Sequence, residues 1–187
     1  MHHDVLQLDI NGTPQAWITP LEAATYYATD AVAWYDGDGP LTTLRGGWNV
    51  AAGRQSLIEV FPIIALRGAS RVNLFDVEPA FCRDRLIKRD RHQCAFCGEV
   101  FRSRDLTIDH IVPQSRGGVD GWLSCVAACG PCNFKKANRT PEEAGMPLLY
   151  LPYRPSLFES FLLRDRPIRA DVHEWLKARL PKGSRLC

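Results

Sequence analysis

Residues 94–138 read CAFCGEVFRSRDLTIDHIVPQSRGGVDGWLSCVAACGPCNFKKAN, and this stretch decides the fold that we predict for the chain. It contains two Cys-x-x-Cys pairs, formed by Cys94, Cys97, Cys129 and Cys132. A Cys-x-x-Cys turn presents two thiolates from one tight knuckle, and zinc takes four such ligands in a tetrahedron. The two pairs therefore predict a structural zinc site with no open coordination position.

The alternatives for these cysteines are disulfide pairing or simple burial. Seven cysteines is an odd number, and no secretion signal opens the chain, so a complete disulfide framework is not expected. The 31 residues between the knuckles exceed ordinary zinc-ribbon spacing, so the chain must leave the metal and return. Cys125 lies in an apolar run and is expected to be a small buried hydrophobe.

Composition and charge narrow the class of protein. With 45% hydrophobic and 24% charged residues, the chain is typical of globular proteins, and its apolar runs are too short for a membrane helix. We therefore expect a cytoplasmic protein without a membrane partner; the sequence leaves the oligomeric state open.

The charge is divided unevenly along the chain. Residues 1–80 carry 4 Lys/Arg against 9 Asp/Glu, a balance of −5, whereas residues 81–187 carry 19 against 12, a balance of +7. The basic half contains the cysteine pairs, which favours a polyanionic partner.

The first 80 residues predict a small α+β layer. Thr19-Pro20 followed by Glu22 is typical of a helix start, and strands are expected over residues 5–10, 31–35, 41–44 and 57–66, with a kink at Pro62. No catalytic spacing is found here, so we interpret the layer as a supporting or docking region.

The flanks of the cysteine stretch favour helices. Residues 79–92 predict a short basic helix that is either a solvated charged face or a phosphate track. Thr140-Pro141-Glu142-Glu143 resembles a helix start that Gly145 closes almost at once. Two further helices are expected over residues 156–163 and 170–180.

Between the knuckles, residues 107–113 (TIDHIVP) alternate as in a strand, so Asp109 and His110 are expected to point to opposite sides. A loop with Gly117-Gly118 follows, then the apolar run 122–128, and Cys132 opens a predicted helix over residues 133–138.

These motifs together resemble the HNH endonuclease family, in particular its zinc-stapled bacterial and phage members. The matching positions are Cys94-x-x-Cys97, Asp109-His110-Ile111-Val112-Pro113, Ser115-Arg116-Gly117-Gly118, Trp122, Ala128-Cys129-x-x-Cys132-Asn133, Lys136 and Arg139-Thr140-Pro141-Glu142-Glu143-Ala144-Gly145-Met146. The resemblance covers about residues 83–147. It implies an α+β protein with a ββα-metal core and a zinc site of four cysteines, flanked by the N-terminal layer and C-terminal helices.

The resemblance also implies roles for individual residues. His110 would be the general base of a DNA endonuclease that leaves 5′-phosphate and 3′-hydroxyl ends, and a histidine suits that role because it titrates near neutral pH. Asp109 and Asn133 would hold one Mg²⁺ or Mn²⁺ through oxygen ligands. The expected phosphate contacts, each of which could instead be a solvated surface charge, are Arg116, Lys135, Lys136 and Arg139.

One position departs from the family pattern. The middle Asn of the motif falls on Ser124, so the order is His, Ser, Asn, and a serine has a shorter reach and no amide. This change keeps a second hypothesis open, a zinc-stabilised nucleic-acid-binding module with weak or no activity. RNA also remains possible as the substrate.

For domain organisation, we expect an N-terminal supporting region over residues 1–80, the nuclease core over 81–147 and a helical extension over 148–187. Because a weaker likeness to the same family continues into both termini, we expect the three segments to pack as one compact unit.

Overall fold

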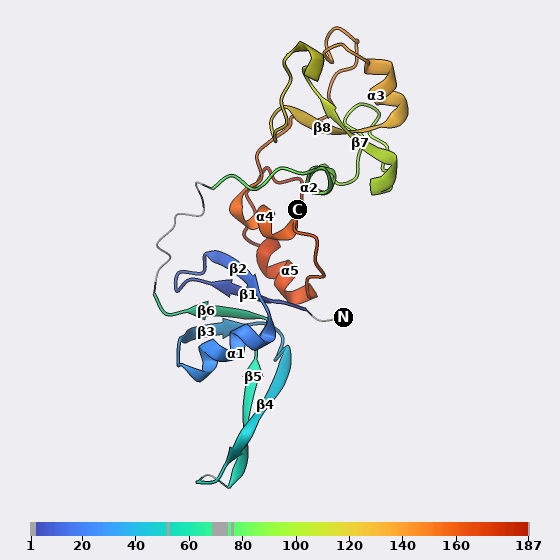
Figure 1. Ribbon diagram of the computed structural model, residues 1–187. Coiled ribbons are helices and arrows are strands. Elements are labelled where there is room, and N and C mark those ends of the chain that lie inside the picture. The colour runs from blue at the N-terminus through green and yellow to red at the C-terminus, as the bar shows by residue number, and fades with distance from the viewer. Residues whose placement is uncertain (1–2, 52, 69–74, 76, 187) are drawn as a thin grey trace. The chain divides into compact units, whose positions relative to one another are not determined.

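The computed structural model describes residues 3–51, 53–68, 75 and 77–186 (Figure 1). The chain divides into two compact units. Unit 1 comprises Met1–Val77 and Arg166–Arg179, and unit 2 comprises Glu78–Asp165 and Leu180–Cys187. The division into segments 1–80, 81–147 and 148–187 stays a prediction.

Unit 1 contains a four-stranded sheet in the order β2-β1-β6-β3, in which only β1 and β6 are parallel. Its strands are β1 (Val5–Leu8), β2 (Pro14–Ile18), β3 (Val32–Asp36) and β6 (Ile63–Leu66). The strands expected near residues 5–10 and 31–35 are confirmed, and the run 57–66 is broken in front of Ile63, as a proline at position 62 requires. Strand β2 was not predicted, because it begins at Pro14, directly after a turn.

Helix α1 (Pro20–Ala28) covers this sheet and begins where the sequence predicts. Thr19 Oγ1 accepts a hydrogen bond from the Glu22 amide (3.2 Å), and Glu22 Oε2 accepts one from the Thr19 amide (2.7 Å). This capping box satisfies two backbone donors that the first helical turn would leave unpaired. The helix then buries Ala23 and Ala24 against β1, β5 and β6.

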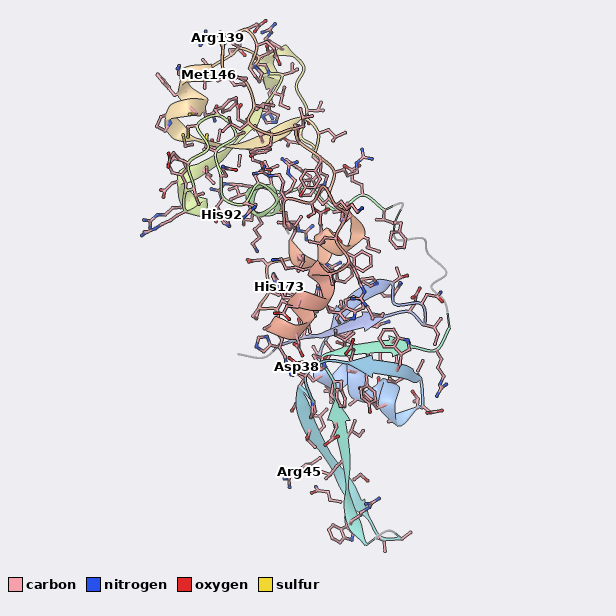
Figure 2. All side chains as sticks on the ribbon, turned by 180° about the vertical axis from the view of Figure 1, so that it is seen from behind. Asp38, Arg45, His92, Arg139, Met146 and His173 are labelled. Atoms are coloured by element: carbon pink, nitrogen blue, oxygen red, sulfur yellow. The ribbon has the colours of Figure 1, made fainter. Side chains whose placement is uncertain are left out.

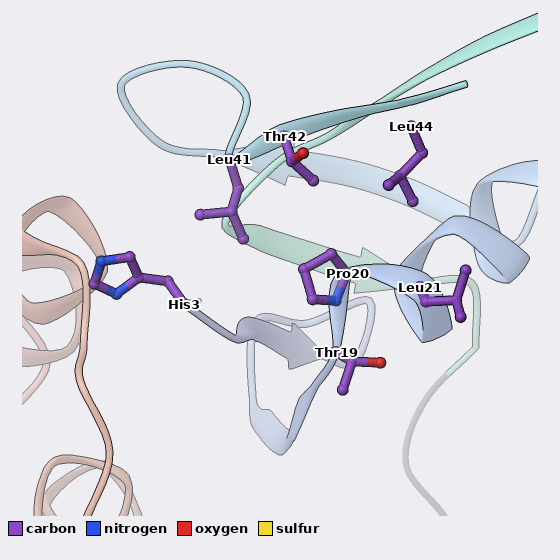
Figure 3. Close-up of a pocket in the computed structure, with 7 residues that line it drawn as sticks. All are labelled: His3, Thr19, Pro20, Leu21, Leu41, Thr42 and Leu44. Atoms are coloured by element: carbon purple, nitrogen blue, oxygen red, sulfur yellow. The ribbon is translucent and has the colours of Figure 1, made fainter. Parts of the chain in front are cut away.

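A two-stranded hairpin of β4 (Thr42–Asn49) and β5 (Arg54–Val60) extends from unit 1 (Figure 1) and is longer than the predicted strand 41–44. Leu44 and Ile58 pack on the core of the unit, whereas Arg45, labelled in Figure 2, is exposed farther along the hairpin. A pocket of about 400 Å³ lies at the base of the hairpin (Figure 3) and is lined by His3, Thr19, Pro20, Leu21, Leu41, Thr42 and Leu44. Since His3 is the one titratable side chain in that lining, we assign the pocket no chemistry.

Helix α5 (Ala170–Lys177) also belongs to unit 1. It buries Val172, Trp175 and Leu176, and the Asp171 carboxylate accepts a hydrogen bond from the Asp38 amide (3.0 Å). The predicted helix over residues 170–180 is therefore confirmed in its first eight residues.

Unit 2 is built on the antiparallel pair of β7 and β8, followed at once by a helix. Leu106 pairs with Cys129 and His110 with Cys125. Its elements are α2 (Arg83–Arg89), β7 (Leu106–His110), β8 (Cys125–Cys129), α3 (Gly130–Lys136) and α4 (Leu157–Leu162). The predicted helix from Thr140 is wrong: Gly145 adopts a φ of 61°, and the segment forms turns.

A buried charge network joins α2 to the β7–β8 pair. The Arg89 guanidinium, which is fully buried, pairs with Asp90 (2.7 Å) and donates to the carbonyl oxygens of Cys125 (3.1 Å) and Tyr153 (3.0 Å). Asp90 in turn accepts from the Ala127 amide (2.8 Å). The ion pair thus holds β8 in place while its hydrogen bonds compensate the loss of water.

None of the helices in the described residues has both the length and the hydropathy that crossing a membrane requires.

Candidate functional site

The four predicted zinc ligands come together at one end of the β7–β8 pair. The sulfur atoms of Cys94, Cys97, Cys129 and Cys132 all lie within 4.8 Å of one another, and none is in a disulfide. Cys97 Sγ lies 4.0 Å from Cys129 Sγ. A tetrahedral zinc with four bonds of roughly 2.3 Å separates its sulfur ligands by about 3.8 Å. The four sulfur atoms are therefore close enough together to hold one zinc ion.

Local backbone geometry explains why the first knuckle folds this way. Gly98 adopts a φ of 79°, a conformation that favours glycine, and its amide donates to the carbonyl oxygen of Cys94 (3.0 Å). Cys129 ends β8 and directly precedes α3, so the second knuckle spans the strand-to-helix turn. Burial raises the pKa of the Cys132 thiol, and the neighbouring thiols add to the rise. A cation is needed to hold four thiolates together, because the metal ligand is the deprotonated form.

Asp109 and Lys136 form a buried ion pair between β7 and α3. Lys136 Nζ donates to Asp109 Oδ1 (3.0 Å) and to the carbonyl oxygen of His110 (2.7 Å), and the two side chains are 1% and 5% exposed. Burial raises the pKa of Asp109, and the hydrogen bond and charge of Lys136 offset only part of that rise. The second oxygen, Asp109 Oδ2, is buried and has no hydrogen-bond partner among the described residues. A bound cation would satisfy that oxygen.

Asn133 lies on the same face of α3 as Lys136, three residues earlier, and reaches the same face of β7. Its amide nitrogen donates to Thr107 Oγ1 (2.9 Å), two residues before Asp109 on the strand. The Asn133 amide oxygen is the atom that can serve as a ligand for a hard cation. The structure therefore places Asp109 and Asn133 at the interface of β7 and α3.

His110 has different neighbours from Asp109. Its Nε2 lies 2.7 Å from Asp120 Oδ1, in the loop that connects the two strands. Cys125 Sγ, opposite His110 in the strand pairing, lies within 4.8 Å of both ligand atoms. Asp120 was not identified from the sequence, because an aspartate in a glycine-containing loop carries no signal of its own.

Ser124 lies at the end of this connecting loop. Its hydroxyl donates to the carbonyl oxygen of Val119 (2.7 Å) and lies 3.4 Å from that of Gly121. The Ser124 carbonyl oxygen accepts from the Ile111 amide (2.9 Å), which prolongs the strand pairing by one bond. Ser124 therefore contacts loop backbone and is not hydrogen-bonded to His110.

The turn after His110 depends on a glycine. The Gly118 amide donates to the carbonyl oxygen of Pro113 (3.0 Å), and a Cβ atom at Gly118 would lie 1.8 Å from the carbonyl oxygen of Val112. No side chain fits there, so this position must be glycine for the loop to close.

The four basic residues expected at phosphate differ in their surroundings. Lys135 is exposed, and Arg139, which follows α3 and is labelled in Figure 2, donates to the carbonyl oxygen of Lys135 (2.7 Å). Arg116 is paired with Glu143 (2.9 Å), and the hydrogen bond from Arg116 holds the pKa of Glu143 down at about 2. Lys136 is buried on Asp109, so its ammonium group does not face solvent.

Comparison with known proteins finds a likeness to HNH endonucleases within unit 2. Residues 94–149 match a family model described as HNH endonuclease. A stretch of 66 residues is 38% identical to the CRISPR-associated endonuclease Cas9 of Campylobacter jejuni subsp. jejuni serotype O:2. That match covers 32% of this chain and 7% of Cas9, so the chain corresponds to a small part of that relative.

Proposed function

We propose that the protein is a metal-dependent DNA endonuclease with a ββα-metal core, made of β7, β8 and α3, and with His110 as the general base. The observation that carries the proposal is the unpaired, buried Asp109 Oδ2 at the interface from which Asn133 also projects. Burial of a carboxylate oxygen without a partner destabilises the folded protein unless a bound ligand contacts that oxygen.

Asp109 and Asn133 would hold one Mg²⁺ or Mn²⁺, because carboxylate and amide oxygens suit hard cations. When bound, the ion would stabilise negative charge on the phosphate and on the leaving oxygen. The cluster of four cysteines, with no open position, would hold a zinc that stabilises the fold and takes no part in the reaction.

The side chains of the protein would perform the remaining steps. His110 takes a proton from a water molecule whose oxygen bonds to phosphorus, while the bond from phosphorus to the 3′ oxygen breaks. The products would be a 5′-phosphate and a 3′-hydroxyl, the latter protonated from solvent. Lys136 holds Asp109 ionised and in place, a role that its burial supports better than a phosphate contact. Lys135, Arg139 and Arg116 would bind backbone phosphates.

Incubation of supercoiled plasmid with the zinc-loaded protein and Mg²⁺ or Mn²⁺ tests this proposal. We expect nicking that the His110→Ala variant lowers by about 10² to 10⁴-fold. His92→Ala, which removes a histidine of the same unit that lies outside the site, should cut at the normal rate. Failure of both metals to support nicking above the level of His110→Ala would end the enzyme proposal.

Ser124 favours the second candidate, a nucleic-acid-binding module with weak or no activity. Fluorescence anisotropy with labelled DNA separates the two, because the module would bind without cutting. Digestion of labelled RNA in parallel determines whether the substrate is DNA or RNA.

A further inference from the structure

The loop between β7 and β8 brings a carboxylate to His110. Asp120 Oδ1 lies 2.7 Å from His110 Nε2, although ten residues separate them in the chain. The His110 side chain is 15% exposed and that of Asp120 is 64% exposed. The contact thus joins a mostly buried imidazole to a carboxylate that is largely exposed.

Ser124 holds the short turn that carries Asp120. The Ser124 hydroxyl bonds to the carbonyl oxygen of Val119, the residue before Asp120, and lies close to that of Gly121, the residue after it. Because β8 begins at Cys125, this hydroxyl connects the turn to a buried strand. The backbone on both sides of Asp120 is therefore held through one side chain.

The direction of the hydrogen bond follows from the chemistry of the two groups. An ionised carboxylate can only accept, so His110 Nε2 must carry the hydrogen. In neutral imidazole the other nitrogen, Nδ1, is then the unprotonated one, which is the form that a general base needs. A carboxylate on Nε2 also holds the imidazole ring in one orientation.

We propose that Asp120 is a positioning residue for His110, and that Ser124 positions Asp120 through the turn. The pair would orient His110 by a carboxylate and a backbone brace. This inference rests on the proposed function for its catalytic consequence, but the state of the His110 ring can be measured without any activity.

Long-range ¹H–¹⁵N correlation spectra of the zinc-loaded protein at a pH where His110 is neutral give that measurement. The His110 signals are identified by their loss in His110→Ala. We expect one tautomer with the hydrogen on Nε2 in the native protein, and averaged nitrogen shifts in Asp120→Ala. Ser124→Ala should move the shifts in the same direction by a smaller amount. Asp105→Asn, which removes an exposed carboxylate elsewhere in the unit, should leave them unchanged.

Kinetics give the second readout. Asp120→Ala should lower kcat by about 10- to 100-fold, the usual loss when the partner of a functional histidine is removed, with KM within about 2-fold. Asp120→Glu should recover part of the loss, since it restores a carboxylate. Unchanged ring shifts in Asp120→Ala, or plasmid cleavage at the native kcat by that variant, would overturn the inference. If the native protein cuts no substrate, the proposed function fails and the ring shifts alone decide the contact.

Discussion

Replacement of Lys136 by Met tests the electrostatics of the site most directly. Met keeps an apolar stem of similar length but removes an ammonium group that makes hydrogen bonds of 3.0 Å to Asp109 and 2.7 Å to the His110 carbonyl oxygen. Both side chains of the pair are at least 95% buried. Removal of one partner of such a pair leaves an uncompensated buried charge, which costs roughly 3–5 kcal/mol of the free energy of unfolding. A typical domain has only about 5–15 kcal/mol in total.

Urea unfolding followed by ¹⁹F-tryptophan NMR measures this cost, because Trp122 is the one tryptophan of unit 2 and reports on it separately. The matched control is Lys135→Met on the same helix, where the side chain is exposed and the expected change is within about 0.5 kcal/mol. The double variant Asp109→Asn with Lys136→Met should recover part of the loss, because no buried charge remains.

The free energy of unfolding should also change with pH in a definite direction. Burial raises the pKa of folded Asp109 above its unfolded value, so ionisation of Asp109 costs stability as the pH rises through that range. In Lys136→Met the ammonium that lowers the pKa is gone, so the pKa rises further and the loss extends to higher pH. The difference in free energy of unfolding between the native protein and Lys136→Met should therefore be largest at neutral pH and decrease towards pH 4. A loss of less than about 1 kcal/mol in the free energy of unfolding, or a loss that does not change with pH, would refute this reasoning.

Three further predictions concern the zinc, the loop and the basic surface. Elemental analysis should find one zinc per chain, and Cys129→Ser should lose it and unfold unit 2. Gly118→Ala should lower the nicking rate at least about 10-fold and cost about 1–3 kcal/mol in a urea titration, because its Cβ would lie 1.8 Å from the Val112 carbonyl oxygen. In DNA titrations, Arg116→Gln should reduce the salt slope by about 1, whereas Glu143→Gln should tighten binding by releasing Arg116; identical slopes would exclude Arg116 as a phosphate contact.

Short-range sequence patterns alone predicted several features of this structure. The four cysteines could be assigned from spacing, because a Cys-x-x-Cys turn fixes the separation of its own thiols. The helix start at Thr19 could also be predicted, since the groups of its capping box are three residues apart. Thr140 shows the limit of such rules: its hydroxyl does accept from the Glu143 amide (3.3 Å), but no helix continues beyond that turn.

The tertiary structure decided the contacts that determine the chemistry. Sequence predicts Lys136 as a surface cation, yet packing of α3 on β7 buries it against Asp109. Asp120 lies ten residues from His110 in the chain, and the loop between β7 and β8 brings the two side chains together. Arg89 joins segments that lie more than thirty residues apart. The sequence by itself therefore determined which four cysteines gather, through short-range geometry and residue type. Which charges are buried, and which carboxylate lies beside His110, depend on long-range packing that no local pattern encodes.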